Sequence, residues 1–131
     1  MRSPMPSILI IDDDADLVQI LTIALQNANY EVFAAGDPKA GLETCRACKP
    51  DMILLDYHMP GNTGAHLFET LRRNTATCKT PILFMSAIAT GDQILGEVAD
   101  PAVSRFLPKP VHMAQLLHTI AEMLSAAAAK K

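Results

Sequence analysis

Four short apolar runs in this chain each end in a polar residue, and this repeated pattern constrains the fold more than any other feature. The runs occupy residues 8–11, 52–55, 81–85 and 105–108, and the polar residues that follow them are Asp12 to Asp14, Asp56, Ser86 and Lys109. Apolar runs that alternate with amphipathic stretches are typical of a parallel sheet with helices on its faces. Such sheets place their sites at the carboxyl ends of the strands, so we expect these polar residues to meet in one site.

The amphipathic stretches between the runs predict helices. The first begins at Asp14 or Ala15 and ends near Asn29, and its core-facing stripe is expected to be Leu17, Ile20, Leu21, Ala24 and Leu25. The second begins at Pro38 with Asp37 as its N-cap. Two more are expected at residues 64–73 and 92–98. The last carries an apolar stripe of Met113, Leu116, Leu117, Ile120, Ala121 and Leu124.

With a short strand at residues 31–34, these elements predict an α/β fold. It consists of a doubly wound, five-stranded parallel sheet, (βα)5, with the strand order 2-1-3-4-5. The 131 residues suffice for one domain with a proper core. We expect that domain at residues 7–125, after a tail at 1–6 and before a helix end or tail at 126–131.

In this strand order the first and third strands are neighbours, so Asp12, Asp13 and Asp56 are expected to lie within a few ångströms of one another. Two like charges about 4 Å apart repel by roughly 4 kcal/mol at an effective dielectric of 20, which calls for a cation or a protonated carboxyl group. Carboxylate oxygens suit Mg²⁺, and the absence of thiolates and imidazoles from these strand ends argues against zinc. Asp56 is the only aspartate at the end of its strand, so we predict that it is the nucleophile and forms an aspartyl-phosphate. Ser86 and Lys109 would hold the phosphoryl oxygens.

Composition argues against several classes of function. The net charge of −3, without a basic face, argues against direct binding to nucleic acid. No apolar stretch approaches the roughly 20 residues that span a bilayer, and residues 1–6 lack the apolar core of a signal peptide. We therefore expect a cytoplasmic protein without membrane insertion. Cys45 and Cys48 form a C-x-x-C pair, which we interpret as packing rather than a redox or zinc site.

With these motifs the chain resembles the receiver domain of two-component response regulators, in particular the single-domain regulators of chemotaxis. The resemblance lies in the ordered motifs at residues 8–14, 50–61, 81–87 and 106–110. It implies a flavodoxin-like fold and a role in phosphorelay signalling, in which a histidine kinase or phosphotransfer protein donates a phosphoryl group to Asp56. It also implies that the protein is not an enzyme beyond phosphotransfer to itself and its own dephosphorylation.

The resemblance further implies a ligand set for Mg²⁺. Asp13 and Asp56 would bind the ion directly, the backbone carbonyl of His58 would be a further ligand, and Asp12 would assist. From the residues alone we expect Asp12 and Asp13 as metal ligands, and the resemblance adds Asp56 and the carbonyl oxygen of His58.

The switch residues are implied in the same way. Ser86 would turn toward one phosphoryl oxygen, Lys109 would pair with another, and Phe106 would change rotamer in step. The surface expected to change, and so to bind a downstream protein, combines residues 92–98, the strand at 105–108 and the last helix. Lys109-Pro110 resembles a cis peptide of the family. Phe106 stands where tyrosine is frequent, Ser86 where threonine is also common, and residues 98–104 depart from the usual sequence.

Two alternatives to this function differ in chemistry. Phosphatases of the haloacid-dehalogenase type also use an aspartate nucleophile with Mg²⁺, but they place a second aspartate two residues later, where this chain has His58 after Asp56. A receiver-like interaction module would keep the fold without accepting a phosphoryl group. The full set of polar residues at the strand ends argues against that second alternative.

Overall fold

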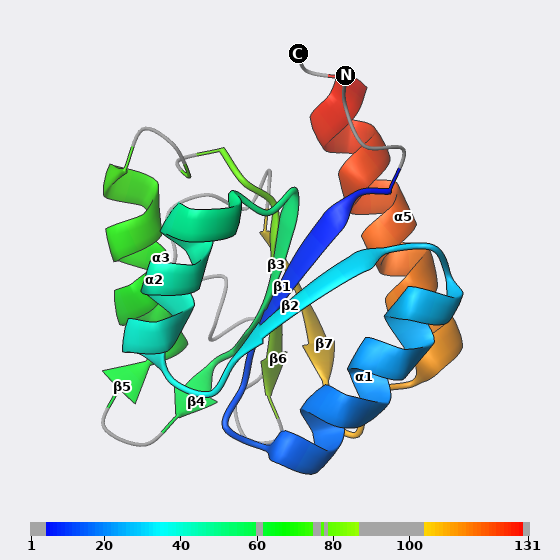
Figure 1. Ribbon diagram of the computed structural model, residues 1–131, viewed down its shortest axis with the longest axis horizontal. Helices are drawn as coiled ribbons and strands as arrows, with labels where there is room; N and C mark the ends of the chain where they lie inside the picture. The colour runs from blue at the N-terminus through cyan, green and yellow to red at the C-terminus, as the bar shows by residue number, and fades with distance from the viewer. Residues whose placement is uncertain (1–4, 60–61, 75–76, 78, 87–103, 130–131) are drawn as a thin grey trace.

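The chain folds around a five-stranded parallel sheet with helices on both faces (Figure 1). The computed structural model describes residues 5–59, 62–74, 77, 79–86 and 104–129. The strands of the main sheet are β1 (Ser7–Ile11), β2 (Glu31–Ala35), β3 (Met52–Asp56), β6 (Ile82–Ser86) and β7 (Ser104–Pro108). Their order is β2-β1-β3-β6-β7, and every neighbouring pair is parallel. Since β6 and β7 are the fourth and fifth strands of this sheet along the chain, this is the predicted 2-1-3-4-5 order. The expected fold class is therefore confirmed.

Among the described residues, two pairs of helices cover the sheet. Helices α1 (Ala15–Asn27) and α5 (Met113–Ala129) lie on one face, and α2 (Pro38–Cys48) and α3 (Gly64–Arg73) lie on the other (Figure 1). In the part of the chain that the structure describes, no helix is long and apolar enough to cross a membrane. The predicted helix at residues 92–98 lies outside the described residues.

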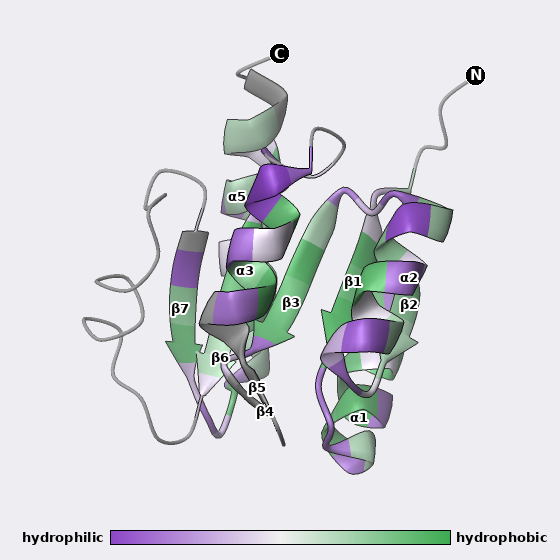
Figure 2. Cartoon of the chain, turned by 90° about the vertical axis from the view of Figure 1, so that its left-hand side faces the viewer, coloured by the Kyte–Doolittle hydropathy of each residue, from purple (hydrophilic) through white to green (hydrophobic). Residues whose placement is uncertain are grey.

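The central strands β1, β3 and β6 are buried along their whole length, and all their residues except Ser7, Asp56 and Ser86 at the strand ends are apolar (Figure 2). Alternate residues of each strand therefore belong to different cores. Leu9, Leu55 and Phe84 face α2 and α3, whereas Ile10 and Leu54 face α1 and α5. This double burial fixes the register of the strands, since a slip by one residue would exchange the two sets.

The predicted helix starts are confirmed by their caps. The Asp14 carboxylate accepts a hydrogen bond from the Leu17 N–H at 3.1 Å, and the Asp37 carboxylate accepts one from the Ala40 N–H at 2.8 Å. Pro38 occupies the start of α2, where its missing N–H is not needed.

The helix stripes are confirmed only in part. In α1, Leu21 and Leu25 are fully buried, but Ile20, which we predicted to face the core, is 57% exposed. In α5, Ala121, which we predicted to face the core, is exposed, and Met123, which the predicted stripe did not include, is buried. The buried stripe of each helix is narrower than the apolar pattern because a helix on a flat sheet brings only its central row into full contact.

A two-stranded antiparallel pair was not predicted. It joins β4 (His58–Met59) to β5 (Asn62–Thr63) and lies between β3 and α3, near the carboxyl end of the sheet (Figure 1). We expected only a turn at residues 59–61, and residues 60–61 lie outside the described part of the chain.

Candidate functional site

Strand register brings the predicted carboxylates together. Ile11 of β1 pairs with Leu55 of β3, so the next residues along these parallel strands, Asp12 and Asp56, emerge side by side. Asp56 in turn pairs with Met85 of β6. The carboxyl ends of the strands form one edge of the sheet, at the bottom of Figure 1.

The same ladder places the lysine and the serine. Ser86, the last residue of β6, pairs with Pro108 of β7, and its carbonyl accepts a hydrogen bond from the Lys109 N–H at 2.9 Å. The Lys109-Pro110 peptide bond is cis, as the resemblance led us to expect. Ser86 is buried at this edge, beside the point where Lys109 leaves the sheet.

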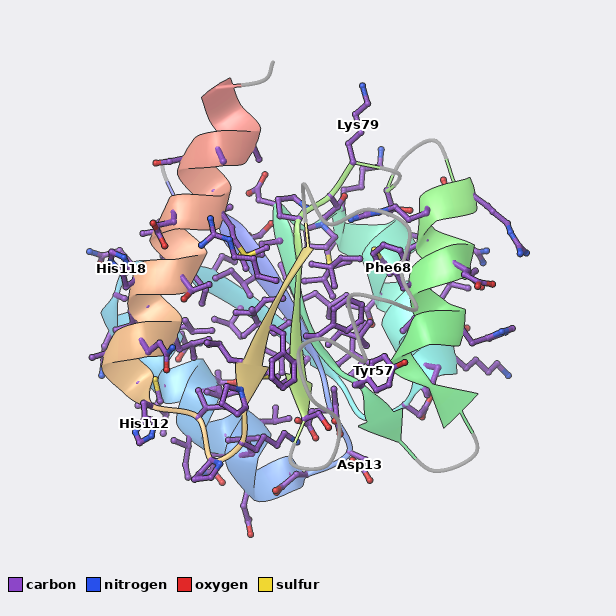
Figure 3. The ribbon with its side chains drawn as sticks, turned by 180° about the vertical axis from the view of Figure 1, so that it is seen from behind. Asp13, Tyr57, Phe68, Lys79, His112 and His118 are labelled. Carbon is purple, nitrogen blue, oxygen red and sulfur yellow. The ribbon has the colours of Figure 1, made fainter. Side chains whose placement is uncertain are left out.

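Three carboxylates form an acidic cluster at this edge, composed of Asp12, Asp13 and Asp56. One carboxylate oxygen from each lies within 4.8 Å of the others. Asp12 and Asp56 are buried, with 1% and 4% of their surface exposed, whereas Asp13 is exposed. Asp13 lies at the end of the sheet opposite to Lys79 (Figure 3). Each pair at this spacing repels by about 3 kcal/mol at an effective dielectric of 20.

Lys109 offsets part of this repulsion. Its Nζ lies 2.9 Å from Oδ2 of Asp12 and 3.6 Å from Oδ2 of Asp56. Burial lowers the pKa of Lys109, but the hydrogen bond and charge of Asp12, followed by the charge and hydrogen bond of Asp56, outweigh burial and leave the pKa above its usual value. The ammonium group therefore stays charged between the two buried carboxylates.

The second oxygen of Asp12 is held by the backbone. Its Oδ1 accepts a hydrogen bond from the Asp14 N–H at 2.9 Å, while Oδ2 accepts the one from Lys109. We did not predict this contact, although an aspartate that accepts from the N–H two residues on is a common turn. Asp14 thus does two things: its side chain caps α1, and its N–H orients Asp12.

Phe106 lies in β7, which β6 separates from β3 and its Asp56. It pairs with Phe84 across β6 and β7 and packs, half-buried, against the core that faces α2 and α3. Tyr57, which directly follows Asp56, is buried in the same core and meets the Phe84 ring edge-on, with centroids 5.8 Å apart. Sequence reasoning did not assign a place to Tyr57, and its position directly after a buried strand was the available signal.

The donor set of the acidic cluster fits a hard divalent cation. Carboxylate oxygens are the ligands that Mg²⁺ prefers, and the exposed Asp13 leaves one side open to water, which this ion retains. His58 begins β4, two residues after Asp56. That carbonyl as a ligand stays a prediction.

The cysteine pair lies away from the acidic cluster and Lys109. Cys45 is buried in the core that faces α2 and α3, and both Cys45 and Cys48 are free thiols at the end of α2. Burial, with a smaller contribution from Cys48, raises the pKa of Cys45 to about 11. Burial also raises the pKa of Cys48. A thiol that resists ionisation is a poor nucleophile and a poor metal ligand, which agrees with a packing role.

The doubly wound sheet and its carboxylate–lysine edge together define a receiver domain. The family described as the response regulator receiver domain matches residues 8–121, and the chain belongs to this family. It is therefore a signalling domain of two-component systems.

Known proteins similar to this chain include regulators of several kinds. The transcriptional activator protein PfeR of Pseudomonas aeruginosa is 36% identical over 86% of this chain and 36% of its own length. The DNA-binding dual master transcriptional regulator RpaA of Synechocystis sp. is 33% identical over 92% of this chain and 49% of its own length. The chain thus spans half or less of these curated relatives. The solved chemotaxis response regulator CheY4 of Vibrio cholerae is 30% identical with a TM-score of 0.82, over 91% of this chain and 98% of that one.

Proposed function

We propose that Asp56 accepts a phosphoryl group from a histidine kinase or a histidine phosphotransfer protein, with Mg²⁺ bound at the acidic cluster. The observation that carries this proposal is the position of Lys109, whose Nζ lies 3.6 Å from Asp56 and 2.9 Å from Asp12. A buried carboxylate beside a fixed cation and two further carboxylates is equipped to react with phosphorus and to hold the charged product.

The transfer forms one bond and breaks another. A carboxylate oxygen of Asp56 attacks the phosphorus of a phosphohistidine, and the P–N bond to the imidazole breaks as the new O–P bond forms. The imidazole retains the electron pair of the broken bond and takes up a proton. Water later attacks the aspartyl-phosphate, which restores the carboxylate and releases inorganic phosphate.

The other residues of the site hold the metal ion and the phosphoryl oxygens in this proposal. Asp13 and Asp56 would hold Mg²⁺ directly, with the backbone carbonyl of His58 as a further ligand, and Asp12 would assist while it holds Lys109. Mg²⁺, when bound, supplies positive charge to the phosphoryl oxygens during transfer. Lys109 pairs with a phosphoryl oxygen through an ammonium group that is already at the site.

We propose Ser86 and Phe106 as the switch that reports phosphorylation. Ser86 is buried beside Lys109, and Phe106 is half-buried in the adjacent strand, two residues before the Pro108 that pairs with Ser86. In this switch the Ser86 hydroxyl turns toward the phosphoryl group and the Phe106 ring changes rotamer in step. The surface that responds includes β7 and α5 and, by sequence, residues 92–98. A downstream protein binds there, in the cytoplasm, without contact to nucleic acid. The domain bounds 7–125 are part of the same proposal.

Mass spectrometry of the intact protein tests the proposal. The chain is incubated with acetyl phosphate and Mg²⁺, next to Asp56→Asn and the control Asp51→Asn, which alters an aspartate at the other end of β3. We expect a single phosphoryl adduct on the wild type and on Asp51→Asn, lost in EDTA and lost in Asp56→Asn. An adduct that persists in Asp56→Asn would refute the assignment of Asp56.

The same experiment separates the two alternative functions. A folded wild-type protein that acquires no adduct from acetyl phosphate or from a phosphorylated histidine phosphotransfer protein would be an interaction module. Continuous release of phosphate from an added phosphate monoester would identify a phosphatase. We expect neither, because His58 stands where the phosphatases place their second aspartate.

A further inference from the structure

The contacts of Lys109 differ in length, and this difference has consequences for metal binding. Nζ is 2.9 Å from Asp12 and 3.6 Å from Asp56, and the Lys109 side chain is only 18% exposed. The ammonium group is therefore fixed inside the acidic cluster, tightly on the Asp12 side and more loosely on the Asp56 side. It supplies a positive charge to the same carboxylates that a divalent cation would use.

Both carboxylate oxygens of Asp12 have a protein donor. One oxygen accepts from the Asp14 N–H and the other from Lys109, and the side chain of Asp12 has no exposed surface. Lys109 is thus held in place by a partner that is itself held by the backbone. The looser contact with Asp56 is the one that a bound cation would weaken first.

We propose that Lys109 is a counter-ion built into the acidic cluster that competes with Mg²⁺ for the carboxylates and thereby sets the metal affinity of the resting domain. This inference rests on the proposed function, in which the acidic cluster is the Mg²⁺ site. Two cations cannot both be close to the same carboxylates without repelling each other. Even at the dielectric of bulk water, a dication and an ammonium group roughly 6 Å apart repel enough to change an affinity about ten-fold.

The competition also links metal affinity to phosphorylation. A phosphoryl group on Asp56 adds negative charge at the place where Lys109 and the divalent cation meet, so it reduces the competition between them. Metal and phosphoryl group then strengthen each other's binding, because coupling between two ligands is reciprocal. Lys109 is a positioning residue in this scheme, since it acts on the metal through the carboxylates.

Magnesium binding without any phosphodonor tests the competition. Backbone amide shifts are followed by NMR while MgCl₂ is added at constant ionic strength to the wild type, Lys109→Met, Lys109→Arg and Lys79→Met. Lys79 is an exposed lysine at the opposite end of the molecule, so its replacement removes the same charge far from the site (Figure 3). We expect Lys109→Met to lower the dissociation constant about ten-fold, Lys109→Arg to resemble the wild type, and Lys79→Met to change it by less than about two-fold.

The outcomes separate clearly. Unchanged or weaker Mg²⁺ binding in Lys109→Met would overturn the competition, and so would an equal gain in Lys79→Met. If Lys109→Met folds only when Mg²⁺ is added, the two cations are alternatives for one role, which supports the proposal. If it stays unfolded at every Mg²⁺ concentration, Lys109→Gln replaces it, and failure of both variants to fold with Mg²⁺ would show that lysine is needed as a structural partner and not as a competitor.

Failure of the competition and failure of the phosphoacceptor role give different results. Tighter Mg²⁺ binding in Lys109→Met, combined with a wild type that forms no adduct, would leave the competition intact and refute phosphorylation. An adduct on the wild type, combined with unchanged affinity in Lys109→Met, would refute the competition alone.

Discussion

An aspartate lies at each end of strand β3, and the two carboxylates have different partners. Asp51 directly precedes the strand, and its Oδ2 accepts hydrogen bonds from the N–H of Ser7 at 2.8 Å and from the Ser7 hydroxyl at 3.3 Å. The backbone N–H of Asp51 donates in return to the Ser7 carbonyl at 2.9 Å and to its hydroxyl at 3.1 Å. This carboxylate joins β1 to β3 through its hydrogen bonds with Ser7.

Asp56, at the other end of the strand, faces two further carboxylates. Its oxygens lie within 4.8 Å of those of Asp12 and Asp13, and Lys109 is the cation at 3.6 Å. The same residue type therefore stabilises the fold at one edge of the sheet and opposes it at the other. Sites often retain such unfavourable arrangements because their chemistry requires them, and the rest of the fold compensates. The candidate site is therefore the end of β3 where three carboxylates gather around one ammonium group.

Removal of Asp51 is expected to have the largest effect on stability. Asp51→Ala leaves the N–H of the buried Ser7 without its charged acceptor, so we expect the free energy of unfolding to fall by about 2 kcal/mol in urea denaturation. Glu43→Ala, on the exposed face of α2, serves as a control and should change the free energy by less than about 0.5 kcal/mol. A loss as small as that of the control would show that the contact between Asp51 and Ser7 does not stabilise the sheet.

The second-largest expected effect is stabilisation by Mg²⁺, which should depend on Asp56 and not on Asp51. At ten times its dissociation constant, Mg²⁺ should stabilise the wild type by about 1.4 kcal/mol through mass action. We expect the same gain in Asp51→Asn and none in Asp56→Asn, because only Asp56 belongs to the acidic cluster. Thermal unfolding with and without Mg²⁺ measures this, and an equal gain in both variants would place the metal elsewhere.

Without a metal ion, Asp56→Asn is expected to stabilise the protein. The amide keeps the shape of the side chain and removes its repulsion from Asp12 and Asp13, while the lost attraction to Lys109 offsets part of the gain. We expect the free energy of unfolding in EDTA to rise by about 1 kcal/mol. A decrease would mean that Asp56, like Asp51, is stabilised by its neighbours, and the contrast between the two ends of β3 would fail.

The sequence predicted the sheet and the strand-end residues well because both depend on local patterns. Continuous apolar runs mark strands buried on both faces, and the residue after each run must emerge at the carboxyl edge. The pairing of Lys109 with Asp12 at 2.9 Å, closer than with Asp56, could not be predicted in this way. It depends on sheet twist and on the path of the chain after β7, which join residues 97 positions apart.

The helix faces show a second limit. Ile20 and Leu21 both fit an apolar stripe by spacing, but only Leu21 reaches the core, since the angle at which α1 crosses the sheet decides which row is central. Likewise Met123 follows Leu116 and Ile120 at helical spacing and is buried, while Ala121 on the margin is exposed. Spacing predicts that a helix is amphipathic, and packing selects the residues.

The smallest expected effect is a dependence on alkaline pH that only one edge of the sheet should show. Asp12 and Asp56 raise the pKa of Lys109 against the opposing influence of burial. A cation with a raised pKa in the folded state gives its full stabilisation below its pKa in the unfolded chain, about 10.4, and loses it as the pH rises through the folded value. In EDTA, the difference in unfolding free energy between the wild type and Lys109→Met should therefore shrink as the pH rises above about 10.4. The difference between the wild type and Asp51→Ala should stay constant over that range, because no lysine is part of the contact with Ser7. If the Lys109 difference also stays constant, the ammonium group is not the counter-charge that holds the acidic cluster together.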